Sequence, residues 1–261
     1  GWTAAVSVAW VMAAQALSGI AKDLTKMSAK SALKTLVPPD RASTLFRWVA
    51  LLTGSKNALK GVGFFLGGAL LAALGFAPAL VAMAVALTAM LAAAVMLLPR
   101  DLGKARRKPG FAILFAKSRT INLLSAARFF LFGARDIWFV VGVPVFLSAV
   151  LGWGFTQVGS FLALWVIGYG VIQALAPTLI GRWSGGRAPG GGTAVILAVA
   201  LTAVTALVPL GLHAGLPAAA VVLGGLGLFG VVFAITSSVH SYLILAYAAD
   251  DEVATDVGFY Y

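Results

Sequence analysis

The residues of this sequence best suited to binding or catalysis are charged residues that lie within long apolar segments. One segment reads Ser125-Ala-Ala-Arg-Phe-Phe-Leu-Phe-Gly-Ala-Arg-Asp-Ile-Trp-Phe, with aromatic and aliphatic residues around Arg128, Arg135 and Asp136. The two arginines are two turns apart and share one face of a helix. An arginine stays charged and can bind a phosphate or carboxylate through two parallel hydrogen bonds. The segment predicts a ligand-binding or gating role for at least one arginine; the alternative is a structural Arg135–Asp136 pair.

A second group of cations recurs at every fourth residue. Lys22, Lys26, Lys30 and Lys34 form one stripe along a continuous helix. Such a stripe could line an aqueous cavity and attract an anion, or it could be a solvated face beside anionic lipid. We expect Lys22 and Lys26 to line a cavity and Lys34 to be solvated. Asp23 can pair with Lys26 one turn further on, which lowers the cost of both charges.

Polar residues in other apolar segments complete the candidates. Lys60 lies roughly 24 Å from the outer end of its helix at about 1.5 Å per residue, which makes it a cavity candidate. Lys56 is close enough to the inner surface to extend its ammonium group there. Asn57 and Gln173 are possible polar lining of a cavity. His240 could titrate near neutral pH and couple the protein to protons, although polar residues in helices often only bond to their own backbone.

The segments that carry these charges are long and apolar. Hydrophobic residues make up 61% of the 261 residues and charged residues 10%, whereas a soluble domain is typically about half apolar and a quarter charged. A spanning helix needs roughly 20 apolar residues. About seven segments qualify: 2–24, which continues as helix to 35, then 48–76, 77–98, 121–147, 158–180, 193–212 and 218–248. We therefore expect an all-α membrane protein.

Basic residues are concentrated in alternate connections between these segments. The formal net charge is +11, and the connection at 100–119 carries most of the basic loop residues. The turns at 76–78, 148–159 and 211–217 contain no lysine or arginine. This asymmetry predicts a bacterial inner-membrane protein whose basic connections are cytoplasmic, with the first residue outside and the last inside. The basic residues are thus explained by topology, and we expect no nucleic-acid partner.

The basic connection also divides the sequence. We expect 1–99 to be the remainder of an N-terminal helix bundle, 100–120 a cytoplasmic linker, and 121–261 a C-terminal bundle. Both bundles are expected to be incomplete, because the chain starts at Gly1 and stops soon after a new apolar run begins at Val257. The spacing Gly63-xxx-Gly67 and the run Gly224-Gly-Leu-Gly227 predict close packing between helices.

Several classes of function lack the residues they need. The sequence has no cysteine, no His-Glu-x-x-His run, and only two histidines, His213 and His240. Thiolate chemistry is therefore excluded, and a zinc site or a membrane-embedded enzyme is not expected. We expect no metal and no cofactor. A scaffold or sensor would not explain arginines on a buried aromatic face, so transport is the favoured class.

Two bundles divided by a long basic connection resemble the major facilitator superfamily. The stretch Gly61-Val-Gly-Phe-Phe-Leu-Gly-Gly resembles its glycine-rich fifth-helix motif, with Phe64 where antiporters usually carry proline. Within that superfamily, the chain resembles the organoarsenical efflux permeases (ArsJ type) of bacterial arsenic-resistance operons. The resemblance rests on AQALSGIAKDLTKMSAKSALKTLVP, LTGSKNALKGVGFFLGGALL, SAARFFLFGARDIWFVVG, FLALWVIGYGVIQALAP and DVGFYY. It implies that the chain covers helices four to ten and the start of eleven.

The resemblance also implies a substrate. The family exports 1-arseno-3-phosphoglycerate, which a glyceraldehyde-3-phosphate dehydrogenase makes from arsenate, so a functional link to that enzyme and arsenate resistance are implied. We expect a monomer that works by alternating access around a site near the midplane. The cations that could hold the two acidic ends of this ligand are Lys22, Lys26, Lys60, Arg128 and Arg135. Asp23 or Asp136 would release a cation when the substrate arrives. The alternative is a proton-coupled exporter of organic anions or drugs.

Overall fold

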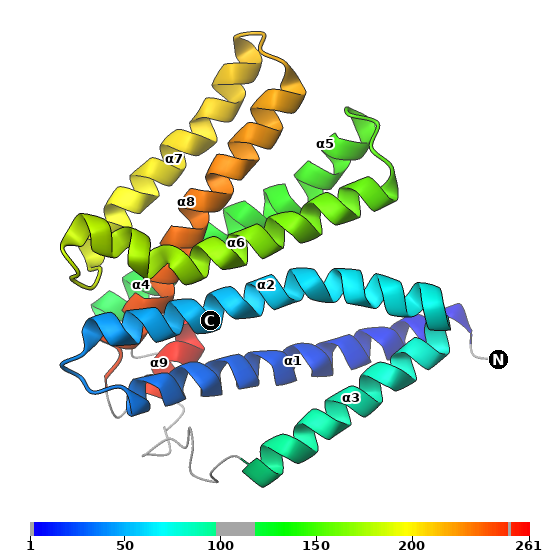
Figure 1. Ribbon diagram of the computed structural model, residues 1–261, viewed down its shortest axis with the longest axis horizontal. Helices are drawn as coiled ribbons and strands as arrows, with labels where there is room; N and C mark the ends of the chain where they lie inside the picture. The colour runs from blue at the N-terminus through cyan, green and yellow to red at the C-terminus, as the bar shows by residue number, and fades with distance from the viewer. Residues whose placement is uncertain (1–2, 98–117, 250–251) are drawn as a thin grey trace.

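The computed structural model describes residues 3–97, 118–249 and 252–261, and this part of the chain is helical, without strands (Figure 1). Seven helical segments are long and apolar enough to cross a membrane. The prediction of an all-α, multi-pass membrane protein is therefore confirmed at this level. The predicted linker at 100–120 lies outside the described residues except for its last three positions.

The helices agree with the seven predicted segments to within a few residues. In chain order they are α1 (Ala4–Leu36), α2 (Ala42–Leu74), α3 (Phe76–Leu97), α4 (Arg119–Asp136), η2 (Ile137–Gly142), α5 (Val143–Ala149), α6 (Phe155–Ser184), α7 (Gly191–His213), α8 (Ala218–Tyr247) and α9 (Val253–Tyr260). The largest difference is at α2, which begins at Ala42 instead of near Trp48. Arg41 and Arg47 lower the hydropathy at this end of the helix, so the apolar segment predicts a later start.

Local sequence signals set several of the helix ends. The hydroxyl of Thr3 accepts a hydrogen bond from the Val6 N–H before α1, and Ser118 does the same for Ile121 before α4. Both are N-cap residues that satisfy a donor left free in the first turn. After the C-terminal end of α6, Gly185 takes a left-handed conformation with φ of 62°, which glycine adopts without steric cost.

The fourth span is not a continuous α-helix. Residues 137–142 form the π-helix η2, in which the N–H of Val143 donates to the carbonyl of Trp138, five residues earlier. Pro144 follows directly and has no N–H, so an α-helical bond to the carbonyl of Val140 cannot form. Segment 121–147 was predicted with nearly the right extent, but its hydropathy gave no sign of this wide turn.

α2 and α6 form the most extensive helix–helix contact of the described chain. A Cβ atom on Gly54 would lie 2.5 Å from the carbonyl oxygen of Gly170, and a Cβ on Gly170 would collide with the backbone N of Ala58. These glycines therefore allow the two backbones to touch. The predicted packing glycines Gly63 and Gly67 have no neighbouring atom within 4 Å of such a Cβ. The prediction of close packing there was wrong, because the contacting face of α2 is the one that carries Gly54.

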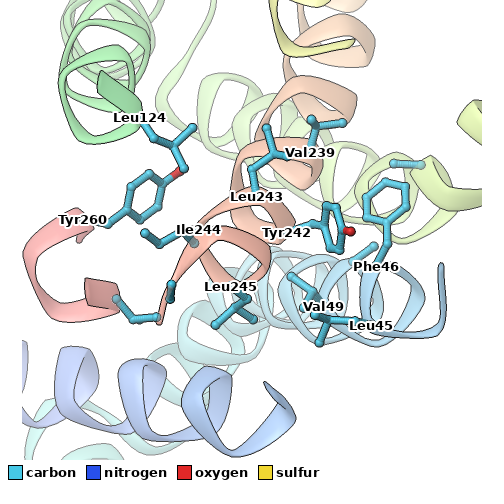
Figure 2. Close-up of a cluster of buried hydrophobic side chains, with 14 of the residues drawn as sticks. Leu45, Phe46, Val49, Leu124, Val239, Tyr242, Leu243, Ile244, Leu245 and Tyr260 are labelled. Atoms are coloured by element: carbon cyan, nitrogen blue, oxygen red, sulfur yellow. The ribbon is translucent and has the colours of Figure 1, made fainter. Parts of the chain in front are cut away.

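α8 is the most buried helix, and its second half crosses α2, α4 and α6. Residues 233–245 are all buried. Figure 2 shows their apolar members packed against Leu45, Phe46 and Val49 of α2, with Leu124 of α4 and Tyr260 of α9 on the opposite side. The rings of Phe46 and Tyr242 lie 5.3 Å apart. This core fixes the relative positions of the helices that carry the charged residues.

Candidate anion-binding site

Three cations from two helices converge on one tyrosine after α9. The ammonium group of Lys30 donates a hydrogen bond to the hydroxyl of Tyr261. The Lys26 Nζ lies 3.6 Å from the centre of the Tyr261 ring, the Lys30 Nζ 4.4 Å and the Arg128 Cζ 4.1 Å. Cations are attracted to the face of an aromatic ring by its quadrupole. We call Lys26, Lys30, Arg128 and Tyr261 the Tyr261 cluster.

The cluster carries more positive charge than its neighbours neutralise. Lys30 is only 3% exposed. Within the described ranges, no aspartate or glutamate forms an ion pair with Lys30 or Arg128. Lys26 has a carboxylate partner, Asp23, at 3.7 Å, and this partner is itself more than half exposed. Burying an unpaired charge is costly unless a counter-ion or hydrogen bonds compensate it.

Further polar groups lie on α1, α4 and α8, the helices that contact Tyr261. The Oγ of Ser241 lies 3.2 Å from the hydroxyl of Tyr261. His240, the residue before Ser241 on α8, is buried and lies close enough to Arg128 for the two side chains to interact electrostatically. The Nδ1 of His240 and the hydroxyls of Ser31 and Ser125 are buried and form no hydrogen bond with any described residue. Buried polar atoms normally have a partner, so these atoms have unused capacity to bind a polar ligand.

Arg135 extends the charged region along α4. The Cζ of Arg128 lies 4.1 Å from the centre of the Phe132 ring, and that of Arg135 lies 4.9 Å from it. The two arginines therefore contact one ring, consistent with the shared face expected from their spacing. Arg135 is already engaged, however: its Nε donates to Asp136 Oδ1 at 2.8 Å, and its Nη2 lies 2.5 Å from the same oxygen. It can take an anion only by exchanging partners.

Two other predicted cavity cations lie apart from the cluster. Lys22 and Lys60 are exposed on the surface of the described chain. The Nζ of Lys60 lies 5.9 Å from the ring of Phe64, one turn along its own helix. No contact found among the described residues joins Lys22 or Lys60 to Tyr261. The structure therefore brings together Lys26 and Arg128 from the predicted set.

The two predicted polar lining residues, Asn57 and Gln173, bond to each other, and Gln173 also bonds to a third helix. The Nδ2 of Asn57 on α2 donates to the Oε1 of Gln173 on α6 at 2.6 Å, and the Nε2 of Gln173 donates to the Oγ of Ser237 on α8 at 2.8 Å. The Oγ of Ser238 donates to the backbone carbonyl of Gln173 at 2.8 Å. We call these four residues the Gln173 network. Gln173 has no exposed surface, so its side chain joins helices in this conformation.

Pro177 explains why Gln173 has a free carbonyl. Proline has no N–H, so Pro177 cannot donate the α-helical hydrogen bond to the carbonyl four residues earlier. That carbonyl belongs to Gln173, and Ser238 supplies the missing donor from α8. The proline therefore creates the acceptor that connects α6 to α8.

Sequence reasoning missed two members of the cluster, Lys30 and Tyr261. The four-residue lysine spacing identifies a stripe but does not tell which of its members is buried. Tyr261 is distant in sequence from α1 and α4, which supply the cations around it, and a single aromatic residue in an apolar run carries no signal of its own. The burial of Lys30 follows from the packing of α1 against α9, which only the tertiary structure reveals.

Comparisons of the chain with models of protein families, with curated proteins and with solved structures found no match. Across the described ranges, no group of three or more histidine, aspartate or glutamate side chains is placed to hold a metal ion. The features of the site are therefore its excess of positive charge, its aromatic contacts and its buried hydrogen-bonding groups.

Proposed function

We propose that this protein is a secondary active transporter that exports a small organic anion, and that the Tyr261 cluster is its binding site. The observation that supports this most directly is the convergence of Lys26, Lys30 and Arg128 on a neutral ring. Such an arrangement keeps cations together without neutralising them. An anion that enters would gain charge-assisted hydrogen bonds, which are about twice as strong as neutral ones.

Each residue has a distinct role in this proposal. The guanidinium group of Arg128 binds two oxygens of a phosphate or arsenate group, a geometry that its planar fork favours. Lys30 supplies a compact charge, and Ser241 supplies a hydroxyl donor. Tyr261 occupies the place of the anion: its hydroxyl oxygen accepts the Lys30 N–H, and the substrate's oxygen takes over that bond. Its ring holds the cations in position between transport cycles.

The sequence resemblance supplies the substrate in this proposal, 1-arseno-3-phosphoglycerate. This molecule carries acidic groups at both ends, and Arg135 on the same face of α4 offers a second cation once Asp136 releases it. The protein would act in the bacterial inner membrane beside a glyceraldehyde-3-phosphate dehydrogenase that makes the ester. Export would proceed by alternating access, with helix groups rocking about the charged site.

Export into everted membrane vesicles tests the proposal. The arseno-ester is generated in the outer medium by purified dehydrogenase, and uptake of arsenic is measured for the natural protein, Arg128→Gln and Lys30→Gln. We expect each variant to lose at least about tenfold in uptake, which corresponds to about 1.4 kcal/mol of lost binding. Arg187→Gln, on the loop after α6, is the matched control and should transport normally. Undiminished uptake by both cluster variants would overturn the proposal.

A proton-coupled exporter of other organic anions or drugs is the second candidate, and His240 favours it. Its buried Nδ1 forms no hydrogen bond with any described residue. Burial and the charge of Arg128 disfavour the imidazolium form, so proton binding here would be coupled to the pairing of Arg128 with an anion. The two candidates differ in competition: 3-phosphoglycerate should inhibit uptake by the first and leave a drug exporter unaffected. His240→Gln should flatten the pH dependence of uptake only under proton coupling through this residue.

A further inference from the structure

A groove between α2 and α6 is separate from the site described above. It encloses about 290 Å³ and is lined by residues at helical spacing on each helix: Thr44, Arg47, Trp48 and Leu51 of α2, with Ala174, Pro177 and Thr178 of α6. The small side chain of Ala174 and the compact ring of Pro177 leave room opposite the indole of Trp48. We call this hollow the α2–α6 groove.

The groove combines one cation with an apolar wall. Arg47 is exposed, and within the described part of the chain no carboxylate forms an ion pair with it. Thr44 and Thr178 add a hydroxyl from each helix, and Trp48 is 52% exposed. A guanidinium group next to hydroxyls matches a phosphate group, whereas an exposed indole next to leucine matches the boundary between headgroups and acyl chains.

The position of the groove along the helices corresponds to the headgroup layer. α2 has 33 residues, which makes it about 50 Å long, whereas the hydrocarbon core of a bilayer is about 30 Å thick. Roughly the first 10 Å of α2 therefore lies outside the hydrocarbon, and Arg47 is in the second turn. Thr178 is in the next-to-last turn of α6. The start of α2 and the end of α6 lie at the same end of the molecule (left in Figure 1).

We propose that the α2–α6 groove binds the phosphate of an anionic phospholipid of the cytoplasmic leaflet, with Arg47 as its principal contact. The basic residues at this end of both helices place it on the cytoplasmic side, where anionic headgroups attract arginine. The acyl chains follow the apolar wall formed by Trp48, Leu51 and Ala174. This site would stabilise the α2–α6 pair, and it is independent of the proposed transport function.

Native mass spectrometry of the purified, delipidated protein tests the site. We expect the natural protein to retain one phosphatidylglycerol at concentrations where phosphatidylcholine is lost, and Arg47→Gln to weaken this binding about tenfold. Arg187→Gln removes a cytoplasmic-side charge that does not line the groove and should change nothing. Equal loss in both variants, no loss in Arg47→Gln, or equal retention of phosphatidylcholine would overturn the proposal.

Two further measurements separate the alternatives. Inorganic phosphate at millimolar concentration should leave phosphatidylglycerol bound; its displacement would show a site for a soluble anion and not for a lipid. Thr178→Val changes an exposed position and leaves Arg47 in place, so it provides a variant with little risk to folding. We expect it to weaken phosphatidylglycerol binding about threefold. An unchanged affinity would show that the Thr178 hydroxyl does not contact the lipid, and this would contradict the groove as the binding site.

Discussion

The Gln173 network and the Tyr261 cluster use neighbouring turns of α8 in opposite ways. Ser237 and Ser238 belong to the network, and Ser241 reaches the cluster one turn later. The network is neutral, and its side chains satisfy one another at 2.6 to 2.8 Å. The cluster is cationic and is held mainly by ring contacts, and the Nδ1 of His240, which lies near Arg128, has no described partner.

This difference indicates which contacts can be exchanged. Separating the network would leave buried amide groups without partners, at a cost of about 1–3 kcal/mol each. Cation–ring contacts are less directional and contribute about 0.5–2 kcal/mol each. An anion that replaces them leaves no polar group unsatisfied. The network is therefore suited to a fixed joint between α2, α6 and α8, and the cluster to a part of the protein that changes partners.

The strongest way to break the fixed joint is to separate its backbones. Gly170→Val would place a side chain against Gly54 and Ala58, so we expect a loss of roughly 3 kcal/mol or more in stability. Gly168→Val on the same helix has the same effect on helix propensity but meets no atom within 4 Å of its Cβ. Thermal unfolding in detergent measures both. Equal destabilisation would contradict the close approach of α2 and α6.

The hydrogen bonds of the joint can be tested next. Gln173→Leu should lower the free energy of unfolding by about 2–3 kcal/mol, because Asn57 and Ser237 each lose a buried partner. Adding Asn57→Leu should recover part of this loss, since removing both partners leaves fewer unsatisfied groups. Gln15→Leu, at an exposed position of α1, is the control. Strict additivity of the two network substitutions would argue against the bond between them.

The cluster should respond with the opposite sign. Lys30→Met keeps an unbranched side chain of similar size and removes a buried charge, so we expect it to stabilise the protein by about 1 kcal/mol. The same change should abolish the thermal stabilisation that a phosphate ester confers on the natural protein. Lys22→Met, at an exposed position of the same stripe, should alter neither quantity. If Lys30→Met instead destabilises the protein, Lys30 contributes to the stability of the fold and is not a site held ready for an anion.

The smallest expected effect concerns a single hydroxyl. Tyr261→Phe keeps the ring under the three cations and removes the acceptor of the Lys30 hydrogen bond, which should cost about 0.5–1.5 kcal/mol. Tyr247→Phe, at an exposed position at the end of α8, is the control. Both are measured by thermal unfolding without added anion. If Tyr247→Phe is the more destabilising, the hydroxyl of Tyr261 is not the one that holds Lys30.

The spans were predictable because length and apolarity are local properties of the sequence. Hydropathy located the seven spans of the described residues, and Ser118 and Gly185 mark two of the helix ends by well-known capping preferences. Glycine spacing was less informative. It drew attention to Gly225, whose Cβ would lie 2.5 Å from Val208 of α7, but also to Gly63 and Gly67, which meet no described atom. The contact of α2 with α6 uses Gly54 and Gly170 instead, since only the packing of the two helices decides which face is covered.

The site was only partly predictable for a related reason. Charges in apolar segments identified Lys26 and Arg128, because a cation in such a segment is costly and therefore informative. Sequence could not distinguish them from Lys22 and Lys60, whose surroundings depend on neighbouring helices. Tyr261 and the partners of Gln173 come from distant segments, and pairings of that kind leave no periodic pattern.

The wide turn of η2 has a consequence for the length of this segment. Each residue of an α-helix turns the chain by about 100°, so one residue more or fewer in 137–142 would rotate everything on its far side by that amount. At present α4 directs Arg128 toward Tyr261, while Phe139 inside η2 contacts Trp165 in a tilted arrangement with ring centres 4.4 Å apart. Deleting a single residue here would leave the hydropathy profile almost unchanged yet uncouple the two contacts. Substitutions should therefore be tolerated in this turn far better than insertions or deletions.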